Sequence, residues 1–146
     1  LILASSRRDI KYLNGIHIWI SSADTDNANL LILLSFIITG HPDWKKADIK
    51  IFDVCKPEDE QKVRKEMEDL VTTGRLPITT ANIEVIPRQA DVTAKSLVNL
   101  KSYDAALTMI GFRKETLKHS GADLFQGYDN LGTVLFVNAH KMREID

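Results

Sequence analysis

The sequence contains four histidines and one cysteine, side chains that can bind metals or act in nucleophilic catalysis: His17, His41, His119, His140 and Cys55. The histidines stand far apart and lack the short spacings of metal-ligating pairs, so we expect no metal site. His17 falls inside an expected strand, where its ring would find a hydrogen-bond partner in the core; a ligand-binding or pH-sensing role is the alternative. Lys56 would lower the pKa of Cys55 slightly. Because the sequence indicates no histidine and no oxyanion donors beside it, we expect Cys55 to have no functional role.

Motifs that build nucleophilic or phosphate-binding sites are absent from the sequence. No Gly-x-Ser-x-Gly elbow and no Gly-x-x-x-x-Gly-Lys sequence occurs. A response regulator needs paired acids directly after its first strand and an aspartate at the end of its third. The expected first strand instead ends in Ser21 and Ser22. The third ends in Pro87 and Arg88, and Asp53 closes the second. We therefore expect no catalytic residue, no cofactor and no enzymatic activity.

Composition narrows the possible functions further. The chain has 146 residues, of which 44% are hydrophobic, enough for one domain with a real core. Its 19 basic and 20 acidic residues give a net charge of −1. We therefore expect neither a basic surface that binds nucleic acid nor a polycationic surface that binds membrane lipids. The single cysteine suits a reducing, intracellular setting. The longest apolar run, residues 30–38, is shorter than the roughly 20 residues of a bilayer span. Because the chain starts at Leu1 without a methionine, we interpret it as a fragment of a longer protein; a processed terminus would look the same.

The elements that must position any site alternate along the chain. Strands are expected over residues 16–20, 48–54, 82–86, 105–110 and 133–137, with helices over 30–39, 57–73, 91–98 and within 115–125. Long crossovers and unbroken apolar strands indicate a parallel sheet that is covered on both faces. The predicted fold is α/β, a three-layer α/β/α sandwich around five parallel strands. Residues 1–14 are an N-terminal extension or contain an edge strand, and residues 15–146 form a single domain.

The expected helix over residues 30–39 is apolar around nearly its whole circumference. Such a helix has to be buried on most sides, so we expect it to be a poor surface for self-association. Trp44 follows this helix and is expected to be a core or hinge aromatic, with a role as an interface anchor as the alternative.

The central part of the sequence resembles a family of transporters. Residues 27–29, Asn-Ala-Asn, stand where animal members carry Asp-Gly-Gly, and residues 30–38 match the apolar helix of these proteins. Residues 44–52 resemble their sequence Trp-Arg-Lys-Cys-Lys-Met-Arg-Ile-Phe without a gap. In that family, the cation–chloride cotransporters, these blocks belong to the cytoplasmic C-terminal domain, which this part of the sequence resembles.

The resemblance extends more weakly to the flanking strands. Residues 15–20 are similar to the family's Ile-Asp-Val-Trp-Trp strand, with His17 at the position of the Asp and Ile20 in place of the second Trp. Residues 104–107 and 131–137 are similar to its last two strands. The short form, without insertions, resembles a prokaryotic member.

The resemblance implies a function for the whole protein. In these transporters a membrane part moves chloride together with sodium or potassium, and the C-terminal domain at the cytoplasmic face contributes to regulation and dimerisation. The chain is therefore expected to be a non-catalytic regulatory or assembly domain whose partners are the membrane domain of the same transporter and a second copy, bound weakly.

The resemblance also implies a fold similar to universal stress proteins, with strand order 3-2-1-4-5. The first and fourth strands are then neighbours, and the connections that follow them run to opposite faces of the sheet. Ligands of open α/β sheets bind beyond the carboxyl ends of two such strands. The residues at this switch point form the candidate binding loop: Ser21, Ser22, Asp24, Gly111 and Arg113. Helix capping and a solvated loop are the alternative explanation of these residues.

A stand-alone nucleotide-binding protein of the universal stress type is the alternative function. Members that bind ATP carry a sequence motif with two glycines separated by two residues. Nine residues after the second glycine, the motif ends in Gly-Ser or Gly-Thr. Here Gly111 fits the first position, but Lys114 occupies the second, and Gly121 is followed by Ala122. Acidic side chains at Asp24 and Asp26 would also repel phosphates, although basic residues of the 113–118 segment could compensate. We therefore expect little or no ATP binding.

A surface for self-association is expected near the last strand. Leu124, Phe125 and Tyr128 crowd into a segment whose helical pattern is interrupted by Gly121 and Gly127. Exposed apolar clusters of this kind often mark interaction sites. The alternative is that the three side chains simply cover the last strand.

Overall fold

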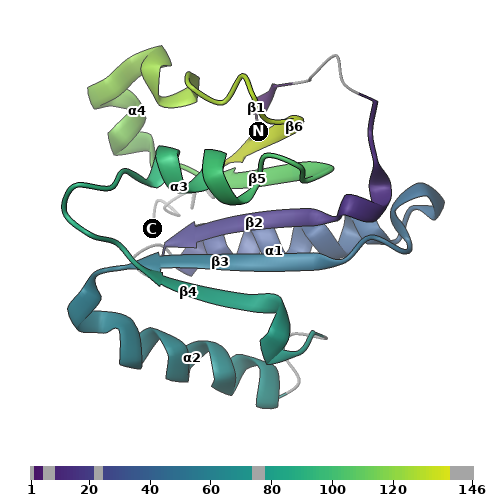
Figure 1. The fold of residues 1–146 in the computed structure, drawn as a ribbon, viewed down its shortest axis with the longest axis horizontal. Helices are drawn as coiled ribbons and strands as arrows, with labels where there is room; N and C mark the ends of the chain where they lie inside the picture. The colour runs from purple at the N-terminus through teal and green to yellow at the C-terminus, as the bar shows by residue number, and fades with distance from the viewer. Residues whose placement is uncertain (1, 5–8, 22–24, 74–77, 139–146) are drawn as a thin grey trace, which may run out of the picture.

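The computed structural model describes residues 2–4, 9–21, 25–73 and 78–138 and shows an α/β fold with one mixed sheet (Figure 1). The strands are β1 (Ile2–Ala4), β2 (Ile16–Ser21), β3 (Ile49–Cys55), β4 (Ile83–Pro87), β5 (Leu107–Gly111) and β6 (Thr133–Val137). The α-helices in the described part are α1 (Thr25–Thr39), α2 (Glu60–Thr72), α3 (Ala94–Lys101) and α4 (Lys114–Ser120). Short 3-10 turns η1 to η5 cover Tyr12–Asn14, Pro42–Trp44, Pro57–Asp59, Thr80–Asn82 and Gly121–Phe125.

The sheet order is β1-β6-β5-β2-β3-β4, which differs from the prediction in strand count and in order. The difference is β1, which pairs antiparallel with β6 at one edge and makes the sheet mixed rather than parallel. The remaining five strands are parallel neighbours in the sequence β4-β3-β2-β5-β6. A three-residue strand carries too little periodicity for the sequence to distinguish it from an extension.

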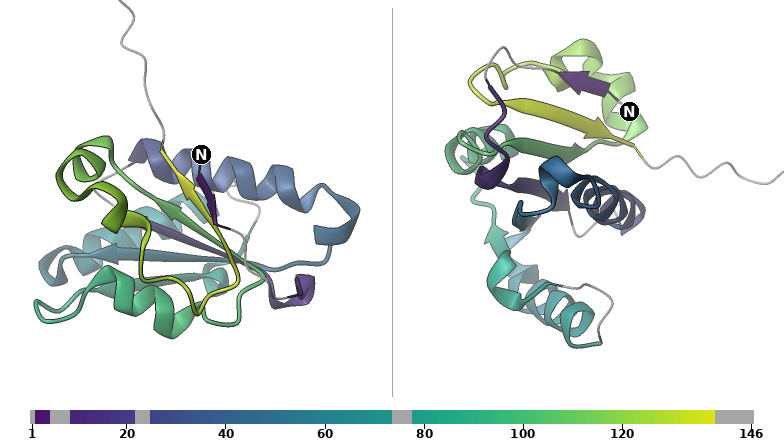
Figure 2. Two further views of the ribbon diagram at one scale, coloured as in Figure 1. Left: turned by 90° about the horizontal axis from the view of Figure 1, so that it is seen from above. Right: turned by 90° about the vertical axis from the view of Figure 1, so that its right-hand side faces the viewer.

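The two faces of the sheet are covered by different helices. Ile18 of β2, paired with Ile51 and Met109, lies on the face where Leu31 of α1 and Met67 of α2 pack. On the other face, a second cluster joins Trp19, Phe52 and Phe136 of the strands to Val98 of α3 and Phe125 of η5. Figure 2 shows α1 and α3 on opposite sides of the sheet. The three-layer arrangement follows from this alternation of buried residues along each strand.

Two local features explain how the central strands start. Gly15 has a φ of +84°, and a Cβ atom there would lie 2.6 Å from the carbonyl oxygen of Asp48, so a glycine is required. The Gly15 carbonyl accepts hydrogen bonds from the N–H groups of Ala106 and Leu107, which ties the start of β2 to the start of β5. The amide of Ile16 donates to Asp48 on the other side and ties β2 to β3.

The helix boundaries differ from the predictions by a few residues. α1 begins at Thr25, before the apolar run, and the buried hydroxyl of Ser35 is accommodated because it donates to the Ile32 carbonyl. The third helix is capped by the Thr93 side chain, which accepts from the Ser96 amide, rather than by Asp91. The weak fourth helix divides into α4 and the tighter turn η5.

Candidate functional site

The carboxyl ends of the central strands border a pocket of about 440 Å³, the carboxyl-edge pocket. Ser21, Cys55 and Gly111 are the last residues of β2, β3 and β5, and all three line it. β2 and β5 are neighbours whose following segments pack on opposite faces, since α1 belongs to one core cluster and η5 to the other. This is the place where open α/β sheets bind ligands. The pocket is therefore the candidate functional site.

The inner wall of the carboxyl-edge pocket is largely apolar and its rim is charged. Trp19, Val98, Ile110 and Tyr128 come from the core cluster on the α3 face. Burial raises the pKa of the Tyr128 phenol, so this side chain stays neutral at physiological pH. The charged residues that line the pocket are two cations and two carboxylates: Lys56, Arg88, Glu58 and Asp59. Because these formal charges cancel, the rim does not concentrate the positive charge that a polyphosphate requires.

The residues predicted for the binding loop are brought together only in part. Ser21 and Gly111 line the carboxyl-edge pocket. Arg113 is the exposed N-cap residue of α4 and is not among the lining residues. Ser22 and Asp24 lie outside the described residues. The sequence reasoning missed Lys56 and Arg88 as site residues, although both directly follow a strand, which was the available signal.

The crevice between β2 and β5 is filled on the α1 side by Asn27. This side chain is 4% exposed, and its Nδ2 donates a hydrogen bond of 2.8 Å to the carbonyl of Phe112. The same carbonyl accepts a second bond, of 2.7 Å, from the Asn138 amide. A Cβ atom at Gly111 would lie 3.3 Å from both the Asn27 Cβ and the Leu31 Cδ1. The protein itself therefore occupies the switch point on this face.

The surroundings of Cys55 disfavour the reactive thiolate form of its side chain. Its side chain is buried, and burial raises the pKa of the thiol, helped by the nearby carboxylates of Asp53, Glu60 and Asp59. The expectation that this pKa is lowered is therefore wrong: desolvation and the surrounding acids outweigh Arg64, the cation that opposes the shift, and Lys56 does not contribute. A protonated thiol is a poor nucleophile, which agrees with the expectation that Cys55 has no functional role.

A small polar network lies between β2 and α3. The hydroxyl of Ser102 accepts a 2.9 Å hydrogen bond from the Trp19 indole N–H and lies 2.7 Å from Nδ1 of His17. Burial lowers the pKa of His17; Asp104 opposes this shift and Lys50 adds to it. Since the hydroxyl already accepts from the indole, its own proton can be donated to Nδ1 of a neutral ring. His17 thus has the hydrogen-bond partner that its position in a strand predicts.

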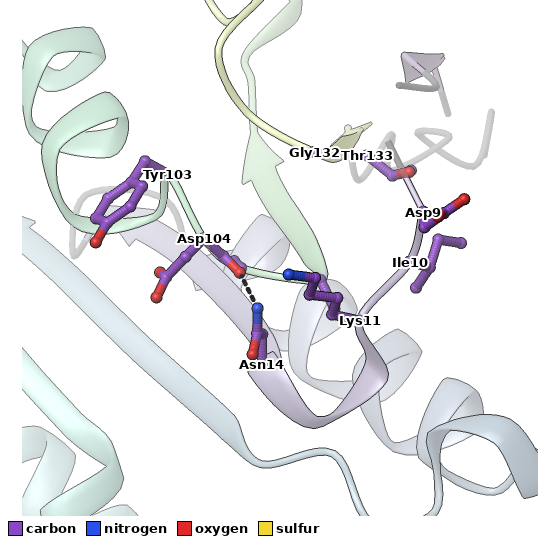
Figure 3. Close-up of a pocket in the computed structure, with 10 residues that line it drawn as sticks. Asp9, Ile10, Lys11, Asn14, Tyr103, Asp104, Gly132 and Thr133 are labelled. Atoms are coloured by element: carbon purple, nitrogen blue, oxygen red, sulfur yellow. Dashed lines mark hydrogen bonds between the residues drawn. The ribbon is translucent and has the colours of Figure 1, made fainter. Parts of the chain in front are cut away.

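A second pocket, of about 410 Å³, lies at the opposite, amino edge of the sheet (Figure 3). It is bordered by residues 9–11 and by the chain leading into β5 and β6, including Asp104 and Gly132. The Asn14 side chain donates a 2.9 Å hydrogen bond to the Asp104 carbonyl, which closes one side. This pocket brings together none of the residues predicted for binding, and it lies away from the edge where α/β sheets bind ligands.

Two of the predicted interface residues, Phe125 and Tyr128, cover the sheet, and none of the three is among the exposed large hydrophobic residues. The Phe125 ring packs edge-on against Phe112 and Phe136, with centroid distances of 5.3 and 4.9 Å. Tyr128 lies 5.5 Å from Phe136, and Leu124 is partly buried. The alternative explanation, that the segment covers β6, therefore accounts for their packing.

The helix expected to be buried on most sides has one uncovered face. Leu33 and Ile37 of α1 are 56% and 63% exposed, whereas Leu31 and Ser35 on the opposite side are fully buried. The expected burial of this helix therefore holds on its other sides but not on this face, and whether the helix is a poor surface for self-association stays a prediction. A three-layer fold supplies a sheet on one side of each helix only, and no described element covers the other side of α1.

Metal centres, membrane spans and known relatives add nothing to this site. Among the described residues, no group of three or more His, Cys, Asp or Glu side chains could hold a metal ion. Likewise, no helix in the described ranges has both the length and the apolar character needed to cross a membrane. No protein-family model matches the chain, and a search of the curated proteins finds no relative.

Proposed function

We propose that this chain is a non-catalytic regulatory and assembly domain of a cation–chloride cotransporter, held at the cytoplasmic face of the membrane. Its partners are the membrane domain of the same transporter and a second copy of itself. The membrane part would move chloride together with sodium or potassium, and the domain would act through contacts rather than through chemistry.

The observation that carries this proposal is the hydrogen bond from Asn27 to the Phe112 carbonyl. Asn27 opens the block with the tightest resemblance to the transporter family, and this block builds α1 and β3. Its first side chain fills, on the α1 side, the switch point at which a universal stress protein would hold a ligand. A crevice that the protein's own side chain fills on one side supports an assembly role over nucleotide binding.

Nucleotide binding by a stand-alone protein of the universal stress type is the second candidate. The carboxyl-edge pocket favours it, because about 440 Å³ is within the range of small-molecule sites and Lys56 and Arg88 stand on its rim. The second glycine of the ATP-binding pattern is replaced by Lys114, and Ala122 stands where its final Ser or Thr would follow Gly121. Together with the two carboxylates on the rim, these departures argue against a bound polyphosphate.

The gene from which the chain derives distinguishes the two candidates. About a dozen apolar segments of roughly 20 residues encoded before Leu1 would support the transporter domain. An initiation codon close to Leu1 would contradict it and favour the stand-alone protein.

A further inference from the structure

The carboxyl-edge pocket is divided into an apolar half and a charged half. Ile110 of β5 and Trp19 of β2 line it near the middle of the sheet, and Val98 of α3 belongs to the same core cluster. Lys56 and Arg88 directly follow β3 and β4, so they stand towards the β4 edge of the sheet. The lining therefore changes from apolar to charged across the order β5-β2-β3-β4.

The charged half of the pocket holds side chains of both signs. β3 and β4 end in register, and the Arg88 amide donates a 2.9 Å hydrogen bond to the Cys55 carbonyl. Lys56 and Arg88 are the next residues along the two strands, so they leave the sheet side by side. The turn η3 then brings Glu58 and Asp59 to the pocket, and the Asp59 amide donates a 2.9 Å hydrogen bond to the Lys56 carbonyl. Two cations and two carboxylates thus share this half.

The four charged side chains form no ion pair with one another or with any other residue that the structure describes. Elsewhere, charges pair closely: Glu84 with Lys101 at 2.7 Å, and Arg64 with Glu60 at 2.8 Å. In the apolar half, the Tyr128 hydroxyl likewise has no hydrogen-bond partner within the described ranges. These groups are therefore free to contact a ligand.

We propose that the carboxyl-edge pocket binds a free α-amino acid with a large apolar side chain. The carboxylate of the ligand lies against Lys56 and Arg88, and its ammonium group lies against Glu58 and Asp59. Its side chain lies over the apolar half, beside Trp19. An α-amino acid carries one positive and one negative charge on neighbouring atoms, and its zero net charge matches the balanced charges of the rim.

Charge and size distinguish this class of ligand from others. A polyphosphate brings only negative charge, which the two carboxylates repel. A wholly apolar molecule would desolvate charged groups without supplying partners for them. The volume of about 440 Å³ is within the range of small-molecule sites, in which a mostly apolar lining provides burial and a few polar groups fix the orientation. A zwitterion with an apolar side chain satisfies both halves of the pocket.

This inference goes beyond the proposed regulatory role, because it assigns a ligand to the domain itself. The crevice that Asn27 fills lies on the α1 side of the sheet, whereas the apolar half of the pocket belongs to the core cluster on the α3 face. The two features are therefore compatible. Neither a membrane part nor a second copy takes part in the binding, so the amino-acid site and the transporter assignment can fail independently.

Isothermal titration calorimetry of the 146-residue chain tests the class of ligand. L-phenylalanine should bind saturably at a single site per chain. N-acetyl-L-phenylalanine lacks the ammonium charge, L-phenylalaninamide lacks the carboxylate, and glycine lacks the apolar side chain. Each of these should bind at least about tenfold more weakly, because a charged contact or the burial of the side chain is lost. No saturable binding of L-phenylalanine at millimolar concentrations, or equal binding of either derivative, would overturn the proposal.

Matched substitutions test the position of the ligand. Arg88→Gln and Glu58→Gln each remove one charge from the pocket and should weaken the binding of L-phenylalanine about tenfold. Lys114→Gln and Glu115→Gln make similar changes at exposed positions of α4 that do not line the pocket, and should bind as wild type does. If Arg88→Gln and Glu58→Gln both bind as these controls do, the assignment to this pocket is wrong.

Tryptophan fluorescence provides a second measurement at the pocket itself. Trp19 lines it, whereas Trp44, the other tryptophan, lies in η2 and packs edge-on against Tyr12 at a centroid distance of 4.8 Å. In a Trp44→Phe variant the remaining emission comes from Trp19 alone, and saturating L-phenylalanine should change its intensity or wavelength. Emission that stays unchanged at saturation would place the ligand away from Trp19 and contradict the site.

Discussion

Nδ1 of His17 lies 2.7 Å from the Ser102 hydroxyl, which joins the central strand β2 to the end of α3, 85 residues further along the chain. The same hydroxyl accepts the Trp19 indole N–H, so one serine serves two neighbouring residues of the strand. Around this group, Glu84 pairs with Lys101 at 2.7 Å and with Lys50 at 3.8 Å. The network attaches α3 to the sheet through polar contacts as well as through Val98.

Stability should fall in mild acid because of His17. Burial lowers its pKa in the folded protein below the ordinary value of 6.5, so the unfolded chain binds the proton first. The contribution of the neutral ring is complete above pH 6.5 and is lost as the pH falls from there towards the lowered folded value. Urea unfolding at a series of pH values should show this loss in wild type and in the control His41→Gln, but a flatter profile in His17→Gln. An equally steep profile in His17→Gln would exclude His17 as the cause.

Ser102→Ala should destabilise the fold by about 1–3 kcal/mol, because the buried indole N–H of Trp19 loses its acceptor. The loss should be smaller when it is measured in a Trp19→Phe background, where no indole N–H remains to be satisfied. A double-mutant cycle from urea unfolding gives the coupling energy. A coupling energy of zero would mean that the hydroxyl does not support Trp19.

Gly15→Ala and Gly121→Ala form a matched pair at positive φ. Their φ values are +84° and +58°, so both variants should lose about 1–3 kcal/mol from backbone strain. Only at position 15 would the added Cβ meet a backbone atom, the Asp48 oxygen at 2.6 Å; position 121 has no atom within 4 Å. Gly15→Ala should therefore be the more destabilised variant in chemical unfolding. Equal losses would show that β2 and β3 can separate at this point without cost.

Phe125→Asp should unfold the domain rather than dissociate a dimer. The ring packs against Phe112 and Phe136, so a carboxylate there should cost more than about 2 kcal/mol. Leu100→Asp, at an exposed position, should stay within about 0.5 kcal/mol of wild type. Thermal unfolding compares the two variants. A Phe125→Asp protein as stable as wild type would mean that this segment is not part of the core and is again a candidate interface.

Millimolar ATP should leave the thermal midpoint of the domain unchanged. A ligand at a hundred times its dissociation constant stabilises a fold by about 2.7 kcal/mol, which melting experiments detect easily. A clear increase in the midpoint that disappears in Gly111→Val would favour the nucleotide-binding candidate, since Gly111 lines the carboxyl-edge pocket.

Local patterns in the sequence predict the parallel part of the sheet and much of the core. Val63 and Met67 are spaced four residues apart on α2, and both are buried, as an amphipathic stripe predicts. α1 lacks such a pattern, because a helix that is apolar all round does not indicate which side faces the sheet. The exposure of Leu33 and Ile37 could therefore be seen only once the layers were in place.

The switch point depends on contacts that no local pattern contains. Asn27 and Phe112 are 85 residues apart, and their hydrogen bond exists only because β2 and β5 are neighbours. Likewise, Lys56 and Arg88 become part of one pocket because β3 and β4 end side by side. The loops that follow the strands can be predicted from the sequence. Which side chain fills the crevice between β2 and β5 cannot.

Ion flux through the full-length gene product, reconstituted into lipid vesicles, is the decisive measurement for the proposed transporter domain. We expect chloride uptake that depends on sodium or potassium and falls when the region corresponding to residues 1–146 is deleted. No chloride uptake by the full-length product, or uptake that deletion of this domain leaves unchanged, would contradict a regulatory and assembly domain of a cation–chloride cotransporter.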